Sequence, residues 1–270
     1  MDTRMNQTAR CWILAVVIAV ASFPAVPCHG QTDEPLACEL ERLTNDTRSE
    51  HGLSWLEPDQ ELERIANLHG RDMLSRDYID HYSPEGKNAT IRVAEGHRRL
   101  FGVVGENIAA YDSRPMAFEE LGGRIMNGWM NSPGHRDNIL ASGYNVIGVG
   151  CWREGDGRYQ KRRCTQLFAH AWAYSLRPVP EKAAVGTLLN LRFRLLGKGA
   201  FPTAMAQVSM DGGRILSFAR LSRIGDDVFG RLTIQGPPGP CRLELHVPDP
   251  GVPLRYNIIP GPVIGVLGGR

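Results

Sequence analysis

Two imidazoles and one carboxylate are the side chains of this sequence best suited to chemistry. His81 lies in the stretch Asp-His-Tyr-Ser-Pro, Glu106 in Gly-Glu-Asn-Ile, and His135 in Ser-Pro-Gly-His-Arg-Asp-Asn-Ile-Leu. The neighbouring Gly and Pro residues predict that all three lie at turns of the chain. Three converging turns would form a polar cleft, and no other part of the sequence carries a chemical signal of similar strength.

Histidine nitrogens and a carboxylate together suit a divalent transition metal, and the nitrogen ligands favour zinc. His81, Glu106 and His135 would leave open positions for water or substrate. A metal-activated water, with Glu106 as base or ligand, could then hydrolyse a substrate. The alternative is a structural network without a metal cofactor, in which these side chains tie loops together while Asn107 and Asn138 satisfy backbone groups.

Other classes of function lack a matching signal. The sequence contains no Gly-x-Ser-x-Gly motif, no Cys-x-x-Cys pair and no phosphate-binding Gly-rich loop. Ser83 and Ser132 each precede a proline, where serine is a common turn residue, and both are interpreted as structural. The formal net charge is only +2 over 270 residues, which argues against nucleic acid as the main partner.

The spacing of apolar residues predicts helices around a small sheet in the first two thirds of the chain. Leu36, Leu40 and Leu43 share one helical face, and Pro133 is predicted to end a later helix. The expected helices are 34–50, 59–75, a weaker one at 91–100, and one from 115 to 132, followed by strands at 144–152 and 163–174. Helices that flank a small antiparallel sheet predict an α+β domain.

The candidate residues lie in a run of motifs that resembles the CAP superfamily, also called the SCP/PR-1-like or cysteine-rich secretory protein domain. The form Ser-Pro-Gly-His-Arg-Asp-Asn-Ile-Leu is similar to the bacterial branch. The resemblance implies an α-β-α sandwich for residues 31–177. The matching motifs follow the family's order over about half of the chain, at residues 43–53, 66–73, 81–84, 105–108, 129–140, 148–150 and 165–168.

The resemblance also implies site residues and a range of functions. Many eukaryotic members carry a second Glu where this sequence has Ser132, so the family's cluster of four is reduced to His81, Glu106 and His135. Some members bind divalent metals with this cluster, and members include sterol and lipid carriers, toxins and defence proteins. The expected function is a non-enzymatic extracellular binding module for a lipid or sterol, an envelope polymer or a protein. The alternative is a metal-dependent hydrolase that uses the same three residues.

Residues 1–30 have the features of a secretory signal peptide. Arg4 and Arg10 precede an apolar run, and cleavage after Gly30 would follow a small residue. A retained anchor is the alternative, although Pro24 and Pro27 interrupt the run. No later stretch is long and apolar enough to cross a bilayer, so the protein is expected to be secreted, periplasmic or on the cell surface.

Cysteine positions predict at least one disulfide in an exported protein. Cys151 and Cys164 flank a predicted hairpin turn at Gly155-Asp156-Gly157, which would set them opposite each other. A second bridge between Cys38 and Cys241 would follow by elimination, and it would tie two domains together.

The composition changes after Ser175, where Pro and Gly separate short apolar runs. These runs, at residues 188–196, 204–210, 228–234 and 242–247, predict strands of a small β-rich, sandwich-like accessory domain over residues 178–270. Arg177-Pro-Val-Pro180 is expected to act as a stiff, extended linker. The alternative for this region is a loosely ordered tail.

Overall fold

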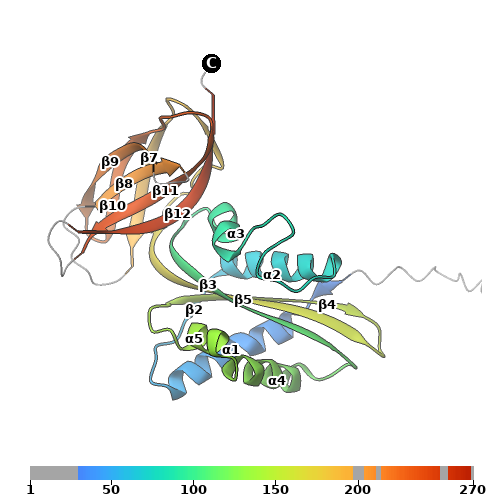
Figure 1. Cartoon of the computed structure of the whole chain (residues 1–270). Coiled ribbons are helices and arrows are strands. Elements are labelled where there is room, and N and C mark those ends of the chain that lie inside the picture. Colours follow the sequence, from blue (N-terminus) through green and yellow to red (C-terminus); the bar gives the residue numbers. More distant parts are fainter. Residues whose placement is uncertain (1–29, 197–203, 211–213, 250–254, 269–270) are drawn as a thin grey trace, which may run out of the picture.

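The computed structural model describes residues 30–196, 204–210, 214–249 and 255–268 (Figure 1). Apart from Gly30, the expected signal peptide lies outside the described residues. Among the residues that are described, no helix is long and apolar enough to cross a membrane.

The region up to Ser175 has three layers, with helices on both faces of a sheet (Figure 1). One apolar core lies between the sheet and α1, α4 and α5, and a second lies between the sheet and α2 and α3. The mixture of helices and strands confirms the α+β class. The elements are β1 (Gln31–Thr32), α1 (Glu34–Glu50), β2 (Glu57–Pro58), α2 (Gln60–Ser75), α3 (Ala89–Gly96), β3 (Leu100–Ser113), α4 (Phe118–Met130), α5 (Pro133–Leu140), β4 (Val146–Gly155) and β5 (Gln160–Ser175).

Short polar side chains determine where two of these helices begin. The carboxylate of Asp59 accepts hydrogen bonds from the backbone N–H groups of Glu61 and Leu62, both at 2.9 Å, at the start of α2. Asn88 caps α3 in the same way through the N–H of Ile91. Both contacts satisfy donors that a helix leaves unpaired in its first turn.

Two elements differ from the sequence-based prediction, and both bear on the cleft. The weaker helix ends at Gly96, and residues 100–113 form β3, which pairs with β5 along its whole length. Glu106 therefore lies within a strand and not at a turn. Pro133 does not simply end α4: it occupies the first turn of a new helix, α5, where a missing N–H costs nothing.

The predicted disulfide between Cys151 and Cys164 is present. The two cysteines are direct partners in the antiparallel pairing of β4 with β5. The bridge inferred by elimination between Cys38 and Cys241 is wrong, although the structure describes both residues. Cys38 is exposed on α1, whereas Cys241 is buried in the core of the C-terminal strands, so the two are not bonded to each other.

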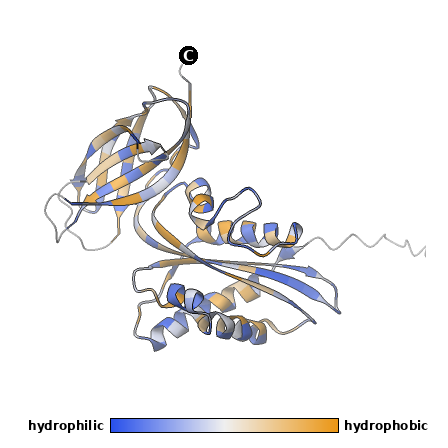
Figure 2. Ribbon diagram, in the orientation of Figure 1, coloured by the Kyte–Doolittle hydropathy of each residue, from blue (hydrophilic) through white to orange (hydrophobic). Residues whose placement is uncertain are grey.

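The C-terminal region is built from strands, and hydrophobic and hydrophilic residues alternate along them (Figure 2). Alternation places every second side chain in one shared core, with the intervening side chains outside. The strands are β6 (Lys182–Ala184), β7 (Leu188–Leu195), β8 (Ala204–Met210), β9 (Arg214–Ile224), β10 (Asp227–Thr233), β11 (Gly239–Pro248) and β12 (Tyr256–Leu267).

The two regions are joined by pairing and packing as well as by the chain. The end of β5 pairs with β7, and Phe101 packs edge-to-face on Phe193 with ring centroids 4.8 Å apart. The predicted linker also lies against the first region: Val179 is buried, and its N–H donates to the carbonyl of Arg98 at 2.7 Å. Arg98 in turn donates to the carbonyls of Val179 and Pro180. Residues 177–180 are thus anchored along their length.

Candidate functional site

The three predicted site residues come from three different elements and converge. His81 lies in the loop after α2, Glu106 in the middle of β3, and His135 in the first turn of α5. His81 Nδ1 and Glu106 Oε1 are 2.8 Å apart, and the imidazole rings of His81 and His135 have centroids 6.5 Å apart. The indole of Trp129 lies beside His135, also with centroids 6.5 Å apart.

A fourth residue, Arg92 on α3, completes this cluster and was not predicted. Its guanidinium is bonded to the second carboxylate oxygen of Glu106, and it also donates to the carbonyls of His81 and Lys87 at 2.9 and 2.7 Å. Both oxygens of Glu106 are thus engaged, and its side chain is only 4% exposed. The sequence signal was a single charged residue in the short apolar helix Ala-Thr-Ile-Arg-Val-Ala.

The two histidines respond to this environment in opposite directions. The hydrogen bond to Glu106 raises the pKa of His81, outweighing the effect of partial burial. Burial lowers the pKa of His135, and the neighbouring His81 lowers it further. Of the two imidazoles, His81, which is bonded to Glu106, is therefore the easier to protonate. Such a separation of pKa values occurs both in acid–base pairs and in structural ion pairs.

Behind the cleft, a chain of amides runs through the first region. Asn138 donates to the carbonyl of Glu106 at 3.1 Å and to Asn107 Oδ1 at 2.9 Å. Asn107 donates to the carbonyl of His135 and to Gln166, and Gln166 donates to the hydroxyl of Thr44 on α1. The expected role of Asn107 and Asn138 in satisfying backbone groups is confirmed by these contacts.

Two members of this hydrogen-bond network, Thr44 and Gln166, were not predicted as site residues. Both are fully buried and both lie in the motif stretches 43–53 and 165–168. Their position within those motifs was the signal that could have identified them. The network joins β3, β5, α1 and α5, so it holds the backbone on both sides of Glu106 and His135.

The arrangement does not match a ready metal site. Within the part of the chain that the structure describes, no group of three or more His, Cys, Asp or Glu side chains is placed to hold an ion. Glu106 faces a guanidinium, whose positive charge opposes a second cation at the same carboxylate. Zinc ligation by His81, Glu106 and His135 would therefore require Arg92 to withdraw.

Comparison with known proteins places part of this chain in a family. The sequence profile of the cysteine-rich secretory protein family (CAP) matches residues 41–170. A stretch of 131 residues is 39% identical to the "uncharacterized membrane protein YlbC" of Bacillus subtilis (strain 168) and covers 48% of this chain and 33% of that protein. A second relative, "uncharacterized protein YkwD" of the same organism, is 35% identical over 113 residues, which cover 42% of this chain and 41% of the relative.

One solved structure also matches part of the chain. The crystal structure of an extracellular protein containing a SCP domain from Bacillus anthracis str. Ames aligns with 32% identity and a TM-score of 0.40, over 50% of this chain and 40% of that one. The chain thus spans less than half the length of the curated relatives it matches. Residues 41–170 belong to the cysteine-rich secretory protein (CAP) family, as their motifs implied.

Proposed function

We propose that this chain is an exported, non-enzymatic binding protein whose His81, Glu106 and His135 cluster is part of a structural network. Export is supported by the features of residues 1–30 and by the Cys151–Cys164 disulfide, because disulfides persist mainly outside the reducing cytosol. Family membership leaves the ligand open, because one fold can serve unrelated functions.

One observation carries the structural interpretation of the cleft. Both carboxylate oxygens of Glu106 are already held, one by His81 and the other by Arg92, and the side chain is nearly fully buried. These two bonds fix the side chain in place, and the positive charge of Arg92 opposes a cation at the same carboxylate. Glu106 has the surroundings of a carboxylate that joins β3 to α3 and to the loop carrying His81.

The rival function is hydrolysis at the same cleft, with or without a divalent metal. It is favoured by the opposite pKa displacements of His81 and His135, since an acid and a base side by side need such a separation. Under this alternative, His81 would donate a proton and His135 would accept one. Zinc would be held by His81, Glu106 and His135 after Arg92 had withdrawn.

Thermal unfolding with zinc and with EDTA separates the two functions. A ligand that binds only the folded state stabilises it by about 2.7 kcal/mol at a hundredfold excess over its dissociation constant. We expect no zinc-dependent rise in the melting temperature, and lower melting temperatures for His81→Ala and His135→Ala in EDTA and zinc alike. His51→Ala, an exposed histidine at the end of α1, controls for weak zinc binding to surface imidazoles.

A rise in melting temperature that disappears in both cleft variants but persists in His51→Ala would establish a metal site. In that case the proposal of a purely structural cleft would be withdrawn in favour of the hydrolase.

The C-terminal region is proposed as an accessory domain over residues 178–270 that carries a ligand-binding surface. Its support is the separate apolar core of β7 to β12, to which the first region contributes only Phe101 and Ala173, with Trp172 packed alongside. A domain that is docked through β7 and the anchored linker can present a ligand at a constant orientation to the CAP domain.

A further inference from the structure

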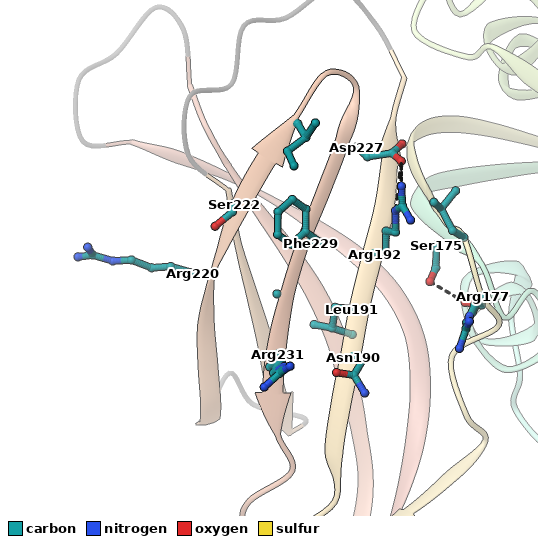
Figure 3. Close-up of a pocket in the computed structure, with 13 residues that line it drawn as sticks. Ser175, Arg177, Asn190, Leu191, Arg192, Arg220, Ser222, Asp227, Phe229 and Arg231 are labelled. Carbon is teal, nitrogen blue, oxygen red and sulfur yellow. Dashed lines mark hydrogen bonds and ion pairs between the residues drawn. The ribbon is translucent and has the colours of Figure 1, made fainter.

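A groove of about 910 Å³ runs along the junction between the two regions. One wall is the outer face of β7, β10 and β9, and the other is formed by residues 175–177 at the end of β5 (Figure 3). Its volume lies in the range of cavities that hold small ligands or short polymer segments. The CAP cleft does not contribute to it: none of His81, Glu106 or His135 lines the groove.

Successive side chains along a strand point to opposite faces of the sheet, and this determines which of them face the groove. Phe229 on β10 stands between two register partners, Arg192 on β7 and Ser222 on β9. Two residues along β10, Arg231 is paired in register with Asn190. In Figure 3 the ring of Phe229 lies between β7 and β9, with Asn190 and Arg231 at one end. The result is an aromatic ring surrounded by cationic and neutral hydrogen-bonding groups.

The groove has an excess of positive charge. Among the described residues that line it, the only carboxylate is Asp227, which is already held by Arg192 at 2.9 Å and by Arg194 at 3.0 Å. Bonding to Arg194, together with Arg192, lowers the pKa of Asp227, so it stays charged and satisfied. Arg177, Arg220 and Arg231 are all exposed, and no described carboxylate lies within ion-pair distance of any of them.

Such a surface is unusual for a purely structural role. The groove carries three like charges, Arg220 and Arg231 on one wall and Arg177 on the other, and no described carboxylate offsets them. The ring of Phe229 remains 37% exposed, on a strand whose inner residues Val228 and Leu232 are nearly fully buried. Guanidinium groups bind carboxylates in a bidentate fork, which gives both strength and orientation.

We infer that this groove binds an acidic oligosaccharide, a sugar chain that bears carboxylate groups. Arg220, Arg231 and Arg177 would take the carboxylates, and the flat face of Phe229 would stack on the apolar face of a sugar ring. Asn190 and Ser222 provide neutral donors and acceptors that suit hydroxyl groups. A two-walled groove fits a chain-like ligand better than a flat lipid surface, which could not reach between β7 and residues 175–177.

This inference builds on the proposed binding role of the chain but uses no residue of the CAP cleft. The two can therefore fail separately. A zinc site at His81 and His135 would overturn the structural interpretation of the cleft and leave the groove untouched. Conversely, a groove that binds no sugar would leave the cleft experiment unaffected.

Calorimetric titration of the full chain with oligogalacturonate tests the groove directly. We expect binding at low ionic strength that weakens as salt is added, because exposed charges are screened over about 10 Å at 0.1 M salt. The control ligand is oligogalacturonate whose carboxylates have been reduced to neutral alcohols. It should bind at least about tenfold more weakly, because it cannot form the charge-assisted hydrogen bonds.

Variants then locate the binding. Arg231→Gln should weaken binding about tenfold, and Arg220→Gln together with Arg231→Gln by about fiftyfold or more. Phe229→Leu, which keeps an apolar side chain on the strand, should weaken it about fivefold through the lost ring. Arg214→Gln is the matched control, an exposed arginine on β9 that does not line the groove, and His135→Ala is the control for the cleft.

Two results would overturn the inference. One is equal loss of affinity in Arg214→Gln and Arg231→Gln, which would mean a non-specific charge effect. The other is tight binding of phosphatidylglycerol vesicles, lost in Arg231→Gln, with no binding of oligogalacturonate. That result would assign the groove to anionic lipid head groups.

Discussion

The two regions of this molecule use charged side chains in opposite ways. In the CAP region, the carboxylate of Glu106 is buried and each of its oxygens has a partner. In the C-terminal groove, Arg220 and Arg231 are exposed and face no described carboxylate within ion-pair distance. Buried charges must be paired, because an unpaired one costs several kcal/mol, by rough estimates. Exposed charges are under no such requirement and remain available for a ligand.

The difference changes where a ligand is to be sought. The residues that stand out in the sequence, His81, Glu106 and His135, surround a carboxylate that is buried and bonded on both oxygens. The groove residues are ordinary arginines on alternating strand positions, and only the three-dimensional pairing of β7, β10 and β9 brings them together. If the proposed function is correct, the conspicuous motif belongs to the architecture, and the ligand binds elsewhere.

The largest expected effect comes from breaking the ion pair in the CAP region. Arg92→Met should destabilise the fold by about 3 kcal/mol, because it leaves the buried carboxylate of Glu106 without its cationic partner. Urea denaturation measures this as a lower midpoint with an unchanged slope. The matched control is Arg124→Met, since Arg124 and Glu120 form an exposed pair on α4 with side chains 53% and 56% exposed. There the expected loss is under about 1 kcal/mol.

Equal losses in the two variants would contradict the distinction between buried and exposed charges. A small loss in Arg92→Met would mean that the bond to His81 is enough to hold Glu106 in its buried position. The cleft would then be flexible enough to take a metal.

A second buried carboxylate in the CAP region predicts a dependence on pH. Asp59 accepts bonds from His97 at 3.2 Å and from the hydroxyl of Tyr174 at 2.6 Å. Burial alone would raise its pKa, but these hydrogen bonds outweigh burial and lower the pKa to about 2. A folded-state pKa below the ordinary value near 4 means that the carboxylate stabilises the fold above about pH 4. That contribution disappears as the pH falls toward 2.

Asp59→Asn should therefore be less stable than the wild type by about 2 kcal/mol at neutral pH, and the gap should close on acidification toward pH 2. Urea midpoints of both proteins across this range provide the measurement. A gap that stays constant down to pH 2 would show that Asp59 acts through packing alone.

The main features of the CAP region could be predicted from its sequence because they depend on local patterns. The apolar stripe of α1, the pairing of Cys151 with Cys164 and the three cleft residues all follow from short-range spacing or motifs. The strand at residues 100–113 was missed because its small residues, such as Gly105 and Ala109, carry little strand propensity. Its conformation comes from pairing with β5, which is a long-range contact.

Charged residues were the hardest to interpret from sequence. Arg162 and Arg163 belong to a basic run that resembles a solvated hairpin tip, yet both are buried. They pair with Asp33 and Asp112, which are distant in sequence. No local pattern encodes such partners. For the same reason, the role of Arg92 could not be predicted from the sequence. The groove could not be predicted either, because its residues are spread over β7, β9, β10 and the linker.

An effect of similar size is expected where the backbone next to Glu106 is tightly enclosed. A Cβ atom at Gly105 would collide with the hydroxyl of Tyr144 and the side-chain oxygen of Asn138. Gly105→Ala should therefore displace Asn138 from the carbonyl of Glu106 and destabilise the fold by roughly 1 to 3 kcal/mol, as overpacking does. Gly123→Ala on α4 is the control, because a Cβ there meets no atom. Calorimetric melting of both variants would show whether the cleft is as rigid as its contacts indicate.

The smallest effect is expected in the groove, and it is the one that distinguishes the two regions most sharply. The double variant Arg220→Gln, Arg231→Gln removes two exposed charges that hold nothing in the fold, so the free energy of unfolding should change by less than about 0.5 kcal/mol per site. Arg162→Gln serves as the comparison, since its guanidinium is buried against Asp33 at 2.9 Å and its loss should cost several times more. If the groove variant were as unstable as Arg162→Gln, its arginines would be part of the architecture, and weaker sugar binding by that variant would reflect unfolding. If it keeps wild-type stability, any loss of binding belongs to the ligand contact itself, because the fold that presents the groove is unchanged.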